Sequence, residues 1–262
     1  DKLTNFDEAE GAMAQLDRFH LSRTPNFEPR RGPVVPSYVA AAEAPLIYLP
    51  IRGGPEAQVR AWLASMDSVE EDALVTRMNQ KTLRQWKRRH PGHRSFTVLR
   101  HPLARAHHVF CTKILPTGPG AMLQIRATLR RVHDLPIPED APGPDWSIDA
   151  HRTAFAAFLD WIGLCLAGAG STRIDSYWES QKTALQGFGE FVLPDFVLRE
   201  DELSNALPTL ADKVGARVVG VPAGDPDTPF TRGDIYDDAL EKKARDVYSR
   251  DYMMFGFSRW DD

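Results

Sequence analysis

The chain has 262 residues, of which 42% are hydrophobic and 26% are charged, and its formal net charge is −4. These values are ordinary for a globular protein, and one large α/β domain is a normal outcome at this length. The negative net charge argues against nonspecific nucleic-acid binding, and no apolar run approaches the ~20 residues that cross a bilayer.

The cysteine content also limits the possible classes of protein. Cys111 and Cys165 are isolated within apolar segments. They are too few for a disulfide framework and lack the spacing of metal ligands, so we expect no metal. A reducing, cytoplasmic setting is the simplest inference. The sequence begins at Asp1 without a methionine, which leaves open whether a targeting segment precedes it.

The first 44 residues read as a lead-in, and the domain is expected to span residues 45–262. Within the lead-in, Phe6–Phe19 has the pattern of a short amphipathic helix. Residues 24–37 are rich in proline and arginine and are expected to be irregular.

Beyond the lead-in, hydrophobic periodicity predicts strands that alternate with helices. Strands are expected at residues 46–49, 95–99 and 191–198. Helices are expected at residues 56–66, 68–89, 103–114, 121–132, 152–167, 203–214 and 236–255, with loops at 134–149 and 221–233. Ser68 and Glu71 have the spacing of a capping box at the start of the second helix. This order predicts a three-layer α/β/α architecture with a central parallel sheet and ligand sites at the carboxyl ends of the strands.

The helix predicted at residues 68–89 carries a cluster of five basic side chains. These are Lys81, Arg84, Lys87, Arg88 and Arg89. They could face a sulfated or phosphorylated ligand, but a solvated helix face is the more common role of such a cluster.

The most informative stretch lies at residues 95–110, where an apolar strand ends at Arg100 and Pro102 opens a helix. A helix N-terminus offers unpaired backbone N–H groups, and the guanidinium adds fixed hydrogen-bond donors, so this junction suits an anion. Arg105 and His108 lie three residues apart and therefore share a helical face. A strand-to-helix turn whose arginine pairs with a nearby carboxylate would have the same local pattern.

This stretch resembles the 3'-phosphate-binding segment of PAPS-dependent sulfotransferases. The family pattern is Val-x-Arg-Asp/Asn-Pro-x-x-Arg-x-x-Ser-x-Tyr, and here the chain has Val98-Leu-Arg-His-Pro-Leu-Ala-Arg-Ala-His-His-Val-Phe110. Arg100, Pro102 and Arg105 are in register, and His108 occupies the serine position.

Three further segments are similar to the carbohydrate and nodulation-type members of that family, in the family's order. Ser176-Tyr-Trp-Glu-Ser-Gln181 resembles their His-Trp-x-Pro-Gln element. Asp195-Phe-Val-Leu-Arg-Glu-Asp-Glu-Leu203 resembles their Asp-Phe-Val-Gly-Arg-x-Glu-x-Leu passage. Residues 248–257, with Tyr248, Asp251 and Phe255-Gly-Phe257, resemble the closing Tyr-x-x-Asp-x-x-x-Phe-Gly-Tyr helix. The resemblance implies a P-loop-like sulfotransferase fold.

The second phosphate segment of the family departs from its usual form. Family members have a loop such as Pro-Lys-Thr-Gly-Gly-Thr-Ser between an early strand and a helix, and its lysine stabilises charge on the bridging oxygen. Here the loop reads Pro50-Ile-Arg-Gly-Gly-Pro-Glu-Ala-Gln58, so Arg52 is the nearest basic residue to the missing lysine. Pro55 supplies no N–H, and Glu56 brings a negative charge that is also a good first-turn helix residue.

The resemblance implies sulfuryl transfer from 3'-phosphoadenosine 5'-phosphosulfate (PAPS), without a metal, to a hydroxyl of a carbohydrate or similar small molecule. Arg100, Arg105 and His108 would hold the 3'-phosphate. Arg52, Gly53 and Gly54 would hold the phosphosulfate, and Arg52 and His108 are the candidate catalytic residues. Tyr177, Trp178 and Gln181 would line the acceptor side.

Two interpretations stay open. The chain is either a sulfotransferase with a divergent donor loop or a non-catalytic binding or scaffold protein that has kept the fold. A nucleotide kinase is disfavoured because no Gly-x-x-x-x-Gly-Lys-Ser/Thr motif is present. Neither the general base nor the oligomeric state follows from the sequence, and the candidates for the base are Glu56, His101, His107 and His151.

Overall fold

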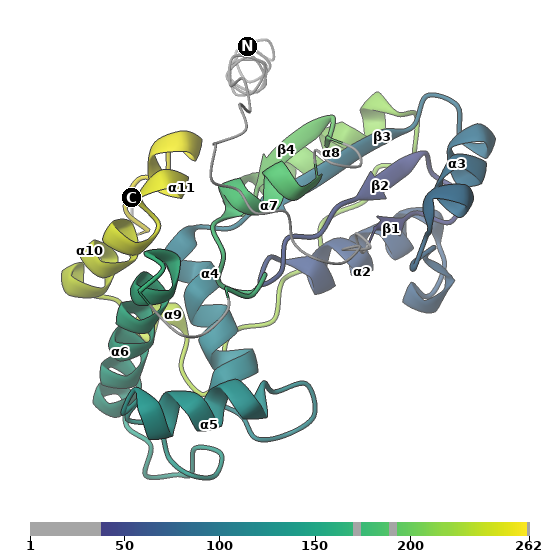
Figure 1. Cartoon of the computed structure of the whole chain (residues 1–262). Coiled ribbons are helices and arrows are strands. Elements are labelled where there is room, and N and C mark those ends of the chain that lie inside the picture. Colours follow the sequence, from purple (N-terminus) through teal and green to yellow (C-terminus); the bar gives the residue numbers. More distant parts are fainter. Residues whose placement is uncertain (1–37, 170–173, 189–192, 261–262) are drawn as a thin grey trace. The chain divides into compact units, whose positions relative to one another are not determined.

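A computed structural model of the chain describes residues 38–169, 174–188 and 193–260 (Figure 1). The helix expected at Phe6–Phe19 and the irregular segment at residues 24–37 lie outside the described residues. Within them the chain has an α/β fold with one four-stranded mixed sheet of order β1-β2-β3-β4. None of the described helices is both long enough and apolar enough to cross a membrane.

The chain divides into two compact units, each of which is built from separated segments. The unit that contains most of the sheet, called the sheet unit, comprises the described residues of Asp1–Pro50, Val59–Val98 and Leu185–Val221. The other, called the helical unit, comprises Ile51–Gln58, Leu99–Ala184 and the residues from Pro222 onward.

The sheet is mixed, whereas a parallel sheet is expected from the sequence. β1 (Val39–Ala40) pairs antiparallel with β2 (Leu46–Tyr48), and β2 pairs parallel with β3 (Arg94–Leu99). β4 (Phe196–Arg199) completes the order. The link between β1 and β2 is a short turn, and antiparallel strands can be joined so closely while parallel ones need a long crossover. β1 lies in residues assigned to the lead-in, so the sheet begins earlier than expected.

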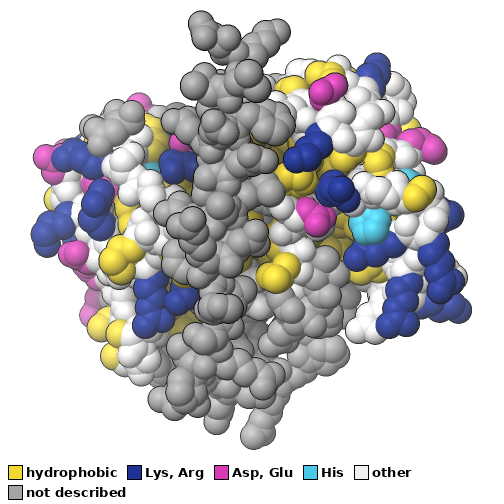
Figure 2. All heavy atoms as spheres, turned by 90° about the horizontal axis from the view of Figure 1, so that it is seen from above, with side chains coloured by type: hydrophobic (Ala, Val, Ile, Leu, Met, Phe, Trp, Pro, Cys, Tyr) yellow, Lys and Arg dark blue, Asp and Glu magenta, His cyan; other side chains and the backbone are white. Residues whose placement is uncertain are grey.

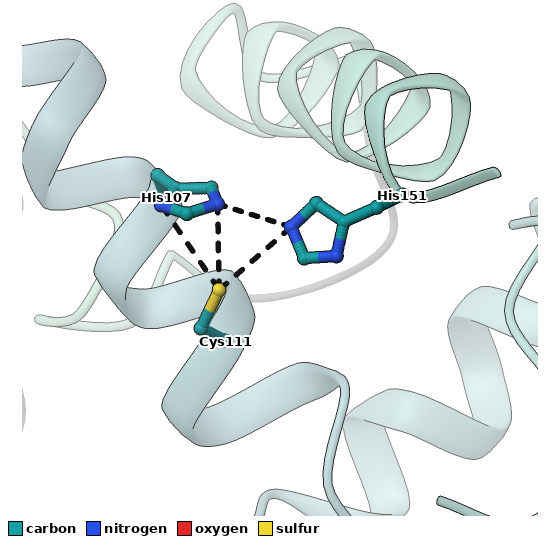
Figure 3. Close-up of side chains that lie close together, drawn as sticks. All are labelled: His107, Cys111 and His151. Carbon is teal, nitrogen blue, oxygen red and sulfur yellow. Dashed lines mark hydrogen bonds between the residues drawn. The ribbon is translucent and has the colours of Figure 1, made fainter. Parts of the chain in front are cut away.

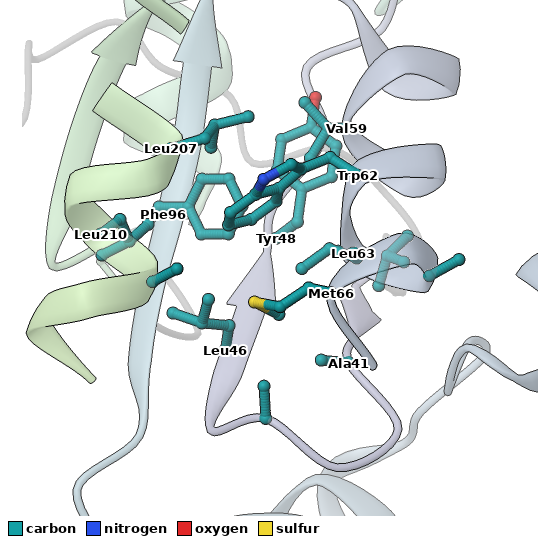
Figure 4. Close-up of a cluster of buried hydrophobic side chains, with 14 of the residues drawn as sticks. Ala41, Leu46, Tyr48, Val59, Trp62, Leu63, Met66, Phe96, Leu207 and Leu210 are labelled. Carbon is teal, nitrogen blue, oxygen red and sulfur yellow. The ribbon is translucent and has the colours of Figure 1, made fainter. Parts of the chain in front are cut away.

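Alternate residues of β2 face two different hydrophobic clusters. Leu46 and Tyr48 pack with Trp62 of α2 (Glu56–Asp67) and Leu207 of α8 (Leu203–Lys213) (Figure 4). Ile47 and Leu49 pack on the opposite side in a second cluster. That cluster also contains Leu83 and Trp86 of α3 (Gln80–Arg89). Since side chains alternate along a strand, this unit has helices on both faces of its sheet.

The helix expected at residues 68–89 is shorter than predicted. Residues 71–73 form only a 3₁₀ turn, η1 (Glu71–Ala73), and α3 begins after Asn79, whose side chain accepts a hydrogen bond from the Thr82 N–H. Val75 is held in extended conformation because its backbone exchanges two hydrogen bonds with Ala40. The expected capping box at Ser68 is therefore wrong, because a long-range strand bridge replaces the local helix.

The basic cluster of α3 is mostly solvent-exposed: Lys81, Arg84, Arg88 and Arg89 are exposed, and Lys87 is partly so. On the described part of the face in Figure 2, lysine and arginine side chains form several separate groups among acidic and apolar ones. This distribution fits a solvated helix face.

Most of the helices expected in the residues of the helical unit are confirmed. α4 (Pro102–Val109) continues into a π-helical turn, η2 (Phe110–Ile114), and is followed by α5 (Leu123–Val132) and α6 (Ile148–Leu166). The expected closing helix is split near Tyr248 into α10 (Asp238–Val247) and α11 (Ser249–Phe255), and α9 (Arg232–Ile235) precedes them. α7 (Gln181–Phe188), whose first turn lies in this unit, was not expected.

Leu207→Ala tests the packing of the sheet unit. Leu207 is fully buried in the cluster against β2, so its truncation is expected to lower the free energy of unfolding by roughly 2–5 kcal/mol in urea denaturation. Leu193→Ala, at a side chain that is 56% exposed in the same unit, is the control and should cost less than about 0.5 kcal/mol. Equal losses in the two variants would contradict this packing.

Candidate functional site

All the residues expected to bind the sulfuryl donor or acceptor belong to the helical unit, and the structure brings several of them together. The turn before α2 is closed by a hydrogen bond from the Gly54 N–H to the Ile51 carbonyl at 2.9 Å. Gly53 has a φ of +77°, and a Cβ atom there would lie 2.7 Å from Val109 Cγ2. A glycine is therefore needed at position 53, because the turn is pressed against α4.

Arg100, at the end of β3, contacts this turn. Its Nη1 donates to the Gly53 carbonyl at 3.2 Å. The side chain of Gln181 binds both sides of the Arg100 backbone: its Oε1 accepts from the N–H at 2.9 Å, and its Nε2 donates to the carbonyl at 2.8 Å. The strand-to-helix junction expected to hold an anion is thus fixed to both the glycine turn and the start of α7.

The segment at residues 176–181 is anchored by α10 and α11. The Asp251 carboxylate accepts from the backbone N–H groups of Gln181 and Lys182 at 2.8 and 3.0 Å. The hydroxyl of Tyr248 donates to the Trp178 carbonyl at 3.1 Å. Burial raises the pKa of Asp251, although these two N–H bonds and the charge of Arg105 oppose the shift. The tyrosine and the aspartate of the closing motif therefore support the element that holds Arg100.

Trp178 and Gln181 do not fit the acceptor-side role expected from the sequence. Their exposed fractions are 1% and 0%. The Trp178 ring packs edge-on against Trp161 with a centroid separation of 5.1 Å, and the Gln181 amide is bonded to the Arg100 backbone. Both side chains are structural in this geometry, because their contact surfaces are used within the unit.

Arg105 is also more deeply buried than a phosphate ligand should be. Its exposed fraction is 2%, and its guanidinium donates to three backbone carbonyls: Arg52 at 2.7 Å, Glu179 at 2.6 Å and Ser176 at 2.9 Å. Through these hydrogen bonds the Arg105 side chain links α4 to the glycine turn and to the segment at residues 176–179. It does not favour the expected contact with the 3'-phosphate.

Two cations flank the ring of Tyr177. Arg52 Cζ lies 5.7 Å from the ring centroid, and Lys113 Nζ lies 5.3 Å from it. Such distances allow cation–π attraction and concentrate positive charge at one place. Sequence reasoning missed Lys113. Its spacing was a usable signal, because Arg105, Val109 and Lys113 recur every four residues and the first two contact the glycine turn.

His107 of α4 forms a buried cluster with Cys111 of η2 and His151 of α6 (Figure 3). His107 Nε2 lies 3.0 Å from His151 Nε2, and Cys111 Sγ lies 3.4 Å from His107 Nε2 and 3.8 Å from His151 Nε2. On its other side, His107 Nδ1 lies 2.8 Å from an Asp227 oxygen. His108 Nδ1 lies 2.7 Å from the second oxygen of the same carboxylate.

The indole of Trp146 fixes the protonation pattern of this cluster. An indole N–H can only donate, and it lies 3.1 Å from His151 Nδ1, which must therefore accept. The proton of a neutral His151 is then on Nε2 and points to His107 Nε2. His107 carries its own proton on Nδ1 and donates it to Asp227. Each nitrogen in the series of hydrogen bonds from Trp146 through His151 and His107 to Asp227 thus has a complementary partner.

His107, Cys111 and His151 are close enough together to hold a metal ion. Coordination through His151 Nε2 would require the proton to move to Nδ1, where it would oppose the N–H of Trp146. Burial, followed by the charge of Asp227, also raises the pKa of Cys111, which disfavours the thiolate that binds metals. The donor set therefore fits a hydrogen-bonded chain better than a metal centre.

The four candidates for a general base lie in different surroundings. His107 and His151 are buried and engaged with each other. His101 Nε2 lies 3.1 Å from the Ser258 carbonyl, and its ring packs against Tyr252 and Phe257. Glu56 is partly buried in the first turn of α2.

Comparison with known proteins adds no relative to this picture. No family model matches the chain, and no curated protein or solved structure matches it either.

Arg105→Lys tests whether the three hydrogen bonds of Arg105 stabilise the fold. A lysine ammonium cannot reach three separate carbonyls from one position, so the free energy of unfolding should fall by roughly 3 kcal/mol. Arg131→Lys, at an exposed position of α5, is the control and should be close to neutral. Chemical denaturation followed by circular dichroism measures both. A neutral Arg105→Lys variant would show that the three bonds contribute little.

The buried hydrogen bonds of His151 and His107 also predict that the stability of the protein is sensitive to acid. Burial, followed by the neighbouring His107, lowers the pKa of His151 from 6.5 to about 4. In that window the unfolded state binds a proton that the folded state does not, so stability should fall as the pH falls from 6.5 towards 4. The loss is about 1.4 kcal/mol per pH unit from this group. Denaturation at several pH values should show this extra slope relative to His151→Gln, and identical slopes would refute the assignment.

Proposed function

We propose that the protein is a sulfotransferase that moves a sulfuryl group from PAPS to a hydroxyl of a carbohydrate or similar small molecule. The observation that carries the proposal is the contact of Arg100, at the strand-to-helix junction, with Gly53 of the turn that precedes α2. The two segments that resemble the family's phosphate-binding elements thus meet in one unit. Their separation in the sequence gives no local reason for this contact.

The remaining motif segments support the proposal through their contacts. Gln181 and Asp251, from two of the family-like segments, are linked to each other, and Gln181 is linked to Arg100. In the sheet unit, the Asp195 carboxylate, at the start of the family-like segment 195–203, accepts from the Ser95 N–H at 2.7 Å and from the Ser95 hydroxyl at 2.9 Å. Each of the segments that resemble the family thus has a polar contact with another of these segments.

The divergent loop is the main departure from the family, and Lys113 would supply the positive charge that the loop lacks. The loop lacks a lysine, but Arg52 and Lys113 both approach the Tyr177 ring. We assign these two cations to the phosphosulfate, together with Gly53 and Gly54. As the bond between sulfur and the bridging oxygen breaks, negative charge develops on that oxygen, and fixed cations stabilise it. Tyr177 is the remaining candidate on the acceptor side.

The reaction asks little covalent chemistry of the protein. The acceptor oxygen forms a bond to sulfur and its hydroxyl proton passes to a base or to water. The bond from sulfur to the bridging oxygen breaks, and 3'-phosphoadenosine 5'-phosphate leaves with that electron pair. By analogy with phosphoryl transfer, the protein aligns the two substrates and stabilises the leaving group. Arg100 and His108 are assigned to the 3'-phosphate, and Arg105 positions the elements around it.

A non-catalytic scaffold of the same fold is the second candidate. Two observations favour it: the three Arg105 nitrogens already bind backbone carbonyls, and Pro55 removes one N–H from the donor loop. Affinity for the sulfuryl donor distinguishes the two functions.

Calorimetric titration with 3'-phosphoadenosine 5'-phosphate tests the proposal. We expect micromolar binding, a loss of at least about tenfold in Lys113→Ala, and a larger loss in Arg100→Ala, because each removes a charge-assisted contact to a phosphate. Lys242→Ala, on the exposed side of α10, is the matched control and should bind as the wild type does. Absence of binding at millimolar ligand would overturn the sulfotransferase proposal and favour the scaffold.

A further inference from the structure

His108 differs from the other histidines of its cluster because, within the described part of the chain, only one of its two ring nitrogens has a hydrogen-bond partner. Its side chain is 30% exposed, while that of His107 is fully buried. His108 Nδ1 is bonded to Asp227, and no described group is bonded to Nε2. Nε2 is therefore the ring nitrogen through which His108 can bond to a ligand.

The protonation of the cluster determines what Nε2 can offer. Asp227 accepts N–H bonds from His107 and His108, and these bonds hold the pKa of its carboxyl well below the ordinary range despite burial. The carboxylate is thus ionised, and His108 Nδ1 must carry a proton. A neutral His108 then has a lone pair on Nε2, which would repel a phosphate oxygen. A protonated His108 has an N–H there, which would donate to it.

The other members of the cluster leave His108 as the site of proton uptake. His107 Nε2 already accepts from His151, and His151 Nδ1 accepts from Trp146, so a proton on either ring would break a hydrogen bond. The Cys111 thiol is buried and neutral. Asp234 of α9 is an exposed carboxylate; its bonds to Thr231 lower its pKa, and the interaction with His107 adds to that shift. Among the residues that the structure describes, Asp227 is the charged group in direct contact with His108.

We propose that His108 binds the 3'-phosphate of the sulfuryl donor as an imidazolium, so that binding of the nucleotide takes up one proton. Asp227 is the positioning residue, because it holds Nδ1–H and thereby fixes the ring with Nε2 left for the ligand. This inference rests on the proposed function for the identity of the ligand. The family's serine at this position offers its hydroxyl at any pH, so the histidine gives this chain a pH-dependent phosphate site.

The test compares two nucleotides over a range of pH. Titration with 3'-phosphoadenosine 5'-phosphate between about pH 7 and pH 9, where the phosphate itself is almost fully ionised, should show affinity falling as the pH rises, towards tenfold per pH unit if one proton is taken up on binding. Adenosine 5'-phosphate, which lacks the 3'-phosphate, should bind more weakly and with little dependence on pH. Calorimetry in buffers of different ionisation enthalpy should register the uptake of a proton with the first ligand only.

Two variants separate this role from a structural one. In His108→Ser, which restores a neutral donor, binding should persist and lose its pH dependence. In Asp227→Asn, which removes the negative charge but keeps an acceptor, the pH at which affinity falls should move down. A wild-type affinity that does not change with pH, or an unchanged slope in His108→Ser, would overturn the inference while leaving the proposed function intact. Absence of nucleotide binding at every pH would overturn both.

Discussion

The candidate site depends on one buried cation. The Arg105 guanidinium joins three chain segments that are far apart in sequence, through bonds to the carbonyls of Arg52, Ser176 and Glu179. A buried charge is costly to desolvate, and three carbonyl acceptors together with the nearby Asp251 carboxylate offset that cost. With this arginine in place, the glycine turn is held on α4 and Tyr177 is held beside Arg52 and Lys113.

Much of the secondary structure follows from local sequence patterns. The apolar residues of α6 recur at helical spacing, and Pro102 occupies the first turn of α4 as its chemistry allows. The glycine turn and Arg100 were also predictable, because both follow strands that lead directly into helices. The failures lie where long-range pairing decides the structure: Val75 is extended because it bonds to Ala40, and β1 is too short to leave a periodic pattern.

The chemistry of the site was less predictable, because it depends on which side chains become buried. Nothing in the local sequence separates Arg100, whose Nη1 donates to the Gly53 carbonyl, from Arg105, whose guanidinium donates to three carbonyls. The same holds for Asp227, which lies in a loop more than a hundred residues from the two histidines that it binds. Trp178 and Gln181 have residue types that suit a sugar, yet their surroundings make them structural.

A crystal structure of the protein with 3'-phosphoadenosine 5'-phosphate would test the account most directly. The account predicts the 5'-phosphate within hydrogen-bond distance of the turn at residues 51–54 and the 3'-phosphate against Arg100 and His108 Nε2, with Arg105 still bonded to its three carbonyls. A nucleotide bound elsewhere, or one whose phosphates avoid Arg100, would contradict the assignment of this site and with it the proposed sulfuryl transfer.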